Sequence, residues 1–129
     1  MSARRATSLL ATALLAACVA TGVATPAFAK SSISLRVAAS HVALGRQIHL
    51  TATGTSDDLG GVPMRLCVEE RVGRGAWFLA GCGREGALSL SVRAGHAGVV
   101  TFRAELLGVG SHGHVVVDRV SGPVTVRVR

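Results

Sequence analysis

The 129-residue sequence has no tyrosine, one tryptophan and three phenylalanines, so aromatic side chains make up only 3% of it. Ligand clefts are usually lined by hydrophobic and aromatic side chains, so this scarcity argues against a chain built around a large cleft. Charged residues are also few, at 16%, whereas 49% of the residues are hydrophobic, which excludes an intrinsically disordered chain. The length leaves room for one compact domain and excludes a multidomain enzyme.

The N-terminus has the composition of a secretory signal peptide. A pair of arginines precedes an apolar run over residues 9–24, and Ala27 and Ala29 supply small residues at the two positions that signal peptidase reads. We expect cleavage after Ala29, so that residues 1–29 are the signal peptide and residues 30–129 the mature domain. Threonine and glycine interrupt the apolar run and no stop-transfer charge cluster follows it, so no stable membrane insertion of the mature chain is expected.

Cys18 leaves a second outcome open. The four residues from Leu15 to Cys18 fit the pattern that lipoprotein signal peptidase uses, in which Cys18 would be lipidated and become the new N-terminus. The protein would then be anchored to the cell surface by lipid. Because the apolar run continues past Cys18 instead of turning polar, we expect a secreted protein.

Cys67 and Cys82 form an even pair in the mature region, which in an exported protein predicts a disulfide. A two-residue hairpin loop at Arg74-Gly75 would place the two cysteines opposite each other on the outer side of the hairpin. In that register they form a hydrogen-bonded pair with Cα atoms ~5.5 Å apart, unless a bulge shifts the strands. The wide spacing is not that of a redox or zinc motif, so we expect a structural disulfide.

The mature region has an all-β pattern, with apolar residues alternating with polar ones and glycines or prolines between the runs. About seven or eight short strands are expected, which is the number typical of a β-sandwich. Trp77 and Leu79 fall on the predicted inner face, and Trp77 is expected to be the largest side chain of the core. The alternating runs are Ile33–Val37, Ile48–Thr53, Met64–Glu69, Trp77–Leu79, Leu88–Arg93, Val100–Leu106 and Val124–Val128.

Several of these segments resemble the bacterial immunoglobulin-like domains of secreted and surface proteins, especially those of actinobacteria. The resemblance covers most of residues 30–129 and implies an antiparallel β-sandwich of about seven strands that serves as a spacer, adhesion module or stalk unit. The absence of tyrosine removes the tyrosine corner of such domains. The resemblance rests on Ile33–Val37, Val42–Gly45, Ile48–Thr53, Gly61–Leu66, Trp77, Gly98–Ala104 and Pro123–Val128.

No group of residues has the spacing of a metal or catalytic site. The histidines are dispersed, and His112 and His114 have only Asp118 as a nearby carboxylate, so a solvated turn is expected there. Glu69 and Glu70 are adjacent on one strand and should point to opposite faces, which prevents them from sharing a substrate atom. We therefore predict no metal, no cofactor and no enzymatic activity. The histidines are His41, His49, His96, His112 and His114.

Arginines occupy outward positions on several strands. Their dispersal does not form the basic stripe of a nucleic-acid-binding protein, so no nucleic-acid partner is expected. Without residues 1–29 the chain keeps twelve basic and seven acidic side chains, a formal net charge of +5, which favours attraction to anionic cell-wall polymers or lipid headgroups. The outward arginines are Arg36, Arg65, Arg93, Arg103, Arg127 and Arg129.

These observations predict a noncatalytic binding or structural module at the cell exterior. Its partner would be an extracellular protein or an anionic cell-wall polymer, and Arg127 and Arg129 are the candidate binding surface. An alternative is a small-molecule carrier similar to the secreted enediyne-binding apoproteins, although the chain lacks their second disulfide and has few aromatics. A weaker alternative, a protease inhibitor, would have only Pro63 to Arg65 as its reactive loop.

Overall fold

The computed structural model describes residues 31–129, which contain nine strands and one short 3₁₀ turn, η1 (Ser111–Gly113). The predicted signal peptide (1–29), Cys18 within it and Lys30 lie outside the described residues. Within residues 31–129 there is no helix of the length and hydropathy that a membrane crossing requires. The strands are β1 (Ser32–Val37), β2 (His41–Val42), β3 (Gln47–Thr55), β4 (Met64–Val72), β5 (Phe78–Arg84), β6 (Gly86–Arg93), β7 (Gly98–Val109), β8 (Val115–Val120) and β9 (Val124–Val128).

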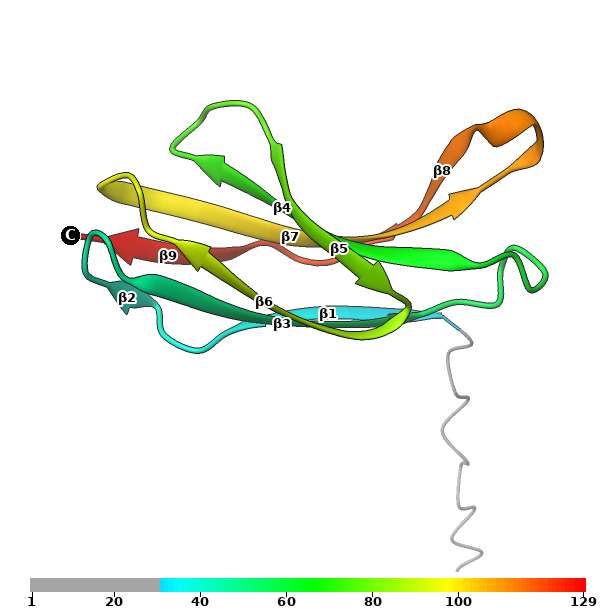
Figure 1. Cartoon of the computed structure of the whole chain (residues 1–129), viewed down its shortest axis with the longest axis horizontal. Coiled ribbons are helices and arrows are strands. Elements are labelled where there is room, and N and C mark those ends of the chain that lie inside the picture. Colours follow the sequence, from blue (N-terminus) through cyan, green and yellow to red (C-terminus); the bar gives the residue numbers. More distant parts are fainter. Residues whose placement is uncertain (1–30) are drawn as a thin grey trace, which may run out of the picture.

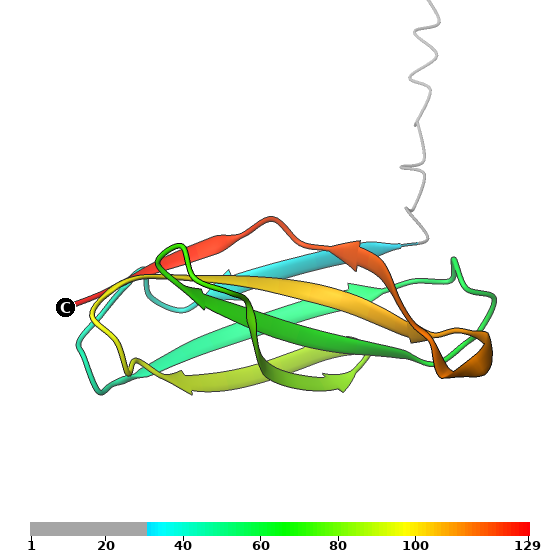
Figure 2. The same cartoon turned by 90° about the horizontal axis from the view of Figure 1, so that it is seen from above.

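The strands form two sheets that lie face to face along the long axis of the molecule (Figure 1). The smaller sheet has the order β1-β3-β6, and the larger has the order β2-β9-β7-β4-β5 with β8 beside β7. All pairs are antiparallel except β2 and β9, which are parallel. Figure 2 shows the same layers from above, with the strands of both sheets running lengthwise. The predicted all-β architecture with two sheets is confirmed.

Alternation of side chains produces the core. In β3, every second residue is buried from Ile48 to Gly54, and the residues between them are exposed. The same period in β4 and β7 turns apolar side chains of the larger sheet towards those of β3. Phe102 of β7 is fully buried and is the largest side chain at the centre of the core. Phe102 therefore takes the place that the sequence analysis gave to Trp77.

One edge of β7 is shared by two strands. Residues Gly98 to Phe102 pair with β9, and residues Glu105 to Val109 pair with β8. Between β8 and β9, Ser121 accepts a hydrogen bond from the Ala104 amide through its Oγ (2.8 Å), and its own amide donates to the Ala104 carbonyl (2.9 Å). These two hydrogen bonds hold Ser121 against β7 at the point where the partner of β7 changes from β8 to β9. As a result β9 stays on the sandwich, while the β7–β8 hairpin projects beyond it (Figure 1).

The predicted disulfide is present, but the hairpin that carries it differs from the expectation. Cys67 pairs with Cys82 in the predicted register, with the Cα atoms 4.0 Å apart. That distance is closer to a non-hydrogen-bonded pair than to the expected hydrogen-bonded one. The connection between β4 and β5 spans residues 73–77 rather than two residues, and a bulge opposite Val68 and Glu69 shifts the register by one.

The prediction that Trp77 and Leu79 face the core is wrong. Trp77 is half-buried in the loop before β5, and Leu79 is 65% exposed. The bulge changes which residues of β5 face inwards, because one extra residue reverses the alternation along the rest of the strand. Gly81 and Gly83 then face β6, where an added Cβ would lie 2.8 and 2.9 Å from Leu90 and Leu88. The glycines thus allow the close approach of β5 to β6.

Two strands were not predicted. β2 has only two residues, too few to show alternation. β8 contains three consecutive valines with no period of two, so its sequence does not distinguish its faces. Both strands lie on an edge of the larger sheet. β2 pairs with β9, far away in the sequence, whereas β8 pairs with β7, the strand before it.

Candidate functional site

Five of the eleven arginines among residues 31–129 lie at one end of the sandwich. The β2–β3 turn, the β4–β5 loop, the end of β6 and the end of β9 all meet at this end (Figure 1). We call this region the basic end and define it by Arg46, Arg74, Arg93, Arg127 and Arg129, all of which are exposed.

Acidic residues are concentrated at the opposite end. The β3–β4 loop, the β5–β6 turn and β8 carry Asp57, Asp58, Glu85 and Asp118. Among the described residues, Glu70 is the acidic side chain that lies at the basic end. Arg65, Arg84 and Arg119 lie among the acidic residues of the opposite end, and Arg119 pairs with Asp58 at 3.6 Å. Charges of both signs are therefore mixed there, whereas arginines predominate at the basic end.

Arg127 of β9 and Arg129, which directly follows β9, alternate with buried valines. Val126 and Val128 are 0% and 2% exposed, so the two arginines point to solvent, as the alternation predicted. Their backbone is held by β2, because the Arg127 amide donates to the Ser40 carbonyl (2.8 Å) and the Arg129 amide donates to the Val42 carbonyl (3.1 Å). This pairing fixes the backbone from which both guanidinium groups extend.

A shallow hollow of about 250 Å³ lies between β2 and β9. His41, Val42 and Ala43 line one side and the two arginines line the other. His41 is in register with Arg127, and its Nδ1 is 3.1 Å from the Ser40 hydroxyl. A hollow with two guanidinium groups and an imidazole can donate hydrogen bonds to a carboxylate or phosphate group and balance its charge. His41 was not among the residues predicted for this site.

A second group of charges surrounds Trp77 on the outer face of the larger sheet, which is the face turned away from the core. The guanidinium carbon of Arg103 lies 4.1 Å from the centre of the indole ring, and that of Arg71 lies 4.6 Å from it. Arg103 also donates hydrogen bonds to Glu69 at 2.9 and 3.3 Å. Glu69 therefore pairs with Arg103 across the strands and not with its neighbour Arg71, and cation–π contacts hold the indole in place.

Glu105 extends this group towards the disulfide. It is in register with Cys67, it is only 7% exposed, and its carboxylate lies 3.5 Å from Arg103. Burial and the adjacent Glu69 carboxyl raise the pKa of Glu105, while Arg103 acts in the opposite direction. Cys67 is 1% exposed and Cys82 is half-buried, so the disulfide is largely covered and joins β4 to β5.

The histidines do not assemble into one site. His49 contacts the Ser91 hydroxyl at 2.8 Å on the exposed face of the smaller sheet. His112 has a φ of 64° in the turn of the β7–β8 hairpin, and His114 follows it. Within residues 31–129, no three His, Cys, Asp or Glu side chains lie close enough together to hold a metal ion.

An apolar strip covers the β7–β8 hairpin. Val109, Val115, Val117 and Val120 are between 46% and 63% exposed. Contiguous exposed apolar surface on a soluble domain is typical of a protein contact. The hairpin is thus chemically distinct from the basic end, and it lies at the opposite end of the molecule (Figure 1).

Comparison with models of known protein families and with curated protein sequences finds no match.

Proposed function

We propose that the protein is a noncatalytic binding module of immunoglobulin-like fold that acts outside the cell and contacts an anionic cell-wall polymer through its basic end. The observation that carries the proposal is the gathering of five exposed arginines at one end of the sandwich, where Glu70 is the acidic side chain among the described residues. A positive surface with little opposing charge nearby attracts a polyanion over several ångströms in solution.

The strand order supports the immunoglobulin-like part of the proposal. A three-stranded sheet packed on a larger sheet, with β7 between β4 and β9, is an arrangement found in that sandwich family. Fold alone does not determine function, so the binding role rests on the surface charge.

The export signal and the disulfide support an extracellular location. Residues 1–29 have the composition of a signal peptide, and disulfides persist in oxidising compartments outside the cytoplasm. The partner proposed here is therefore a polymer that a secreted protein would meet at the cell surface.

The size of the hollow beside Arg127 and Arg129 favours polymer contact over the carriage of a large ligand. It measures about 250 Å³. Sites for drug-sized molecules are usually about 300–1,000 Å³. A shallow hollow beside exposed arginines suits an anionic group on a chain that continues past the site.

The test is sedimentation of the purified protein with isolated cell walls at increasing sodium chloride. Binding should fall as salt rises, most steeply near physiological ionic strength, where the Debye length is ~8 Å. Replacing both Arg127 and Arg129 by glutamine should weaken binding without changing thermal unfolding, since both side chains are exposed. Salt-insensitive binding, or no binding together with turnover of an ester, peptide or glycoside, would refute the proposal.

A further inference from the structure

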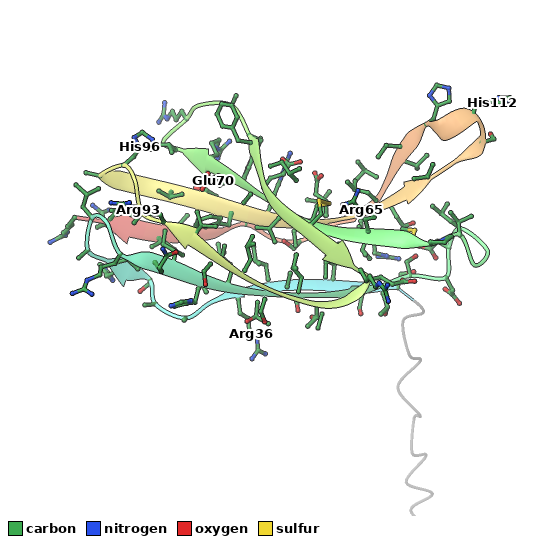
Figure 3. The ribbon with its side chains drawn as sticks, in the orientation of Figure 1. Arg36, Arg65, Glu70, Arg93, His96 and His112 are labelled. Carbon is green, nitrogen blue, oxygen red and sulfur yellow. A yellow bond between two sulfur atoms is a disulfide. The ribbon has the colours of Figure 1, made fainter. Side chains whose placement is uncertain are left out.

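A second hollow, of about 150 Å³, opens between the two sheets at the basic end. We call it the inter-sheet hollow and define it by the residues that line it. These are Ile48, Glu70, Val72, Arg93, Ala94, Gly95, His96 and Val100. Figure 3 shows the labelled Glu70, Arg93 and His96 at the same end of the sandwich, on β4, on β6 and in the β6–β7 loop.

The floor of the inter-sheet hollow is apolar. Ile48, Ala94 and Val100 are 1%, 1% and 4% exposed, so the hollow ends on the closed surface of the core. The rim is charged, because Arg93 and His96 are exposed at its mouth. A ligand that enters would therefore place an apolar group inside and polar groups at the opening.

Glu70 is the feature that points to a ligand. It is half-buried on the core-facing side of β4, and among the described residues it has no ion pair and no side-chain hydrogen bond. Glu69, its neighbour in the sequence, lies on the outer face and is paired with Arg103. A carboxylate without a partner at the mouth of an apolar hollow can accept hydrogen bonds from an ammonium group, and a ligand that covers it must supply such a donor.

The charges around the inter-sheet hollow limit which kind of ligand can bind there. A ligand with only positive charge would be repelled by the arginines of the basic end, whereas a ligand with only negative charge would be repelled by Glu70. A neutral apolar ligand would bury the Glu70 carboxylate without compensation. A ligand with a positive and a negative group satisfies Glu70 and the Arg93–His96 rim together.

The volume limits the size of the ligand. A cavity of about 150 Å³ is known to hold a benzene molecule, so this hollow accepts roughly six to nine non-hydrogen atoms. We propose that the inter-sheet hollow binds a free α-amino acid with a short aliphatic side chain. Its ammonium group lies against Glu70, its carboxylate lies against Arg93 and His96, and its side chain contacts Ile48 and Val100. A ligand of this size is expected to bind with a dissociation constant on the order of 1 mM.

The experiment is an NMR titration of the purified, ¹⁵N-labelled protein with L-leucine. The backbone amide signals of Ala94, Gly95 and His96 should shift and saturate. Glu70→Gln should weaken binding at least about tenfold, since it keeps the shape and removes the charge. Glu85→Gln is the matched control, because Glu85 lies at the opposite end of the sandwich, and it should leave the titration unchanged.

Two leucine analogues separate the contributions of the charged groups. Leucinamide, which lacks the carboxylate, should bind more weakly, and Arg93→Gln should not weaken its binding further, because that change removes a repulsive charge. It also stands for the N-terminal residue of a peptide, so equal binding of leucine and leucinamide would overturn the assignment of a free amino acid. 4-Methylpentanoate, which lacks the ammonium group, should not bind. The absence of saturable shifts up to about 50 mM leucine, far above the expected dissociation constant, would overturn the proposal, as would undiminished binding by Glu70→Gln.

Discussion

Phe102 lies at the centre of the core, whereas the larger Trp77 lies on the outer face of the larger sheet. Substitution of each residue by alanine tests this placement. Phe102 is 0% exposed at the centre of the core, so Phe102→Ala removes a fully buried ring and leaves a cavity. Such changes cost about 3–5 kcal/mol. That is a large part of the roughly 5–15 kcal/mol that stabilises a domain of this size.

Trp77→Ala should cost much less. The indole is half-buried on the outer face, and its recognisable contacts are the two guanidinium groups at 4.1 and 4.6 Å. Cation–π contacts near the surface contribute about 0.5–1 kcal/mol each. The buried part of the ring adds to this, but no cavity is left in the core, so we expect a loss of about 2 kcal/mol, below that of Phe102→Ala. For a domain of about 100 residues, each kilocalorie per mole lowers Tm by about 4–8 °C.

The assay is urea and thermal unfolding followed by far-ultraviolet circular dichroism, because Trp77 is the only tryptophan and its replacement removes the fluorescence signal. Phe102→Leu, which leaves a smaller cavity, provides a graded variant if Phe102→Ala does not fold. A Trp77→Ala loss equal to that of Phe102→Ala would refute this account and return Trp77 to the core.

Three further predictions concern stability. Replacing Cys67 and Cys82 by alanine should lower the free energy of unfolding by about 3 kcal/mol, given their separation of 15 residues. Reductant should then have no further effect on the stability of this variant. An unchanged denaturation midpoint would contradict the prediction. Because the pKa of Glu105 is raised in the fold, its ionisation opposes folding as the pH rises. Glu105→Gln should therefore be more stable than the wild type at pH 7 and lose that advantage below the ordinary glutamate pKa, as measured by urea unfolding across pH. Gly81→Ala places a Cβ 2.8 Å from a leucine of β6 and should lower the free energy of unfolding by about 1–3 kcal/mol. Gly95→Ala, whose added Cβ would have nothing within 4 Å, should change it by less than about 0.5 kcal/mol. Equal effects of the two substitutions would show that β5 does not approach β6 closely.

The strands that could be predicted from the sequence are those with one buried and one exposed face. β3 is the clearest example, because alternate burial from Ile48 onwards leaves only one register with an apolar inner face. Trp77 could not be placed in this way. The bulge that reverses the phase of β5 depends on how that strand packs against β6 through Gly81 and Gly83, which is a contact between elements and not a local pattern.

The candidate site likewise contains some residues that the sequence predicts and others that only the contacts between strands bring together. The exposure of Arg127 follows from its alternation with Val126, so it could be predicted from the sequence. His41 enters the site through a parallel pairing of two residues with β9, and no local signal marks a contact across that distance in the chain. The inter-sheet hollow around Glu70 forms where the ends of the two sheets meet, so it is visible only in three dimensions.

The most direct test of polyanion binding at the basic end is the salt dependence of affinity for a soluble polyanion, such as polyphosphate, in two charge-matched double variants. One carries Arg127→Gln with Arg129→Gln. The other carries Arg36→Gln with Arg65→Gln, which removes the same charge from exposed positions away from the basic end. By analogy with nucleic-acid binding, the slope of log K against log salt should become shallower by about one unit for each phosphate-binding arginine that is replaced. We predict that the first variant has a lower affinity and a slope shallower by up to about two units, while the second keeps a slope close to that of the wild type. Equal reductions in the two variants would show that net charge alone determines binding, and would contradict a binding site at the basic end.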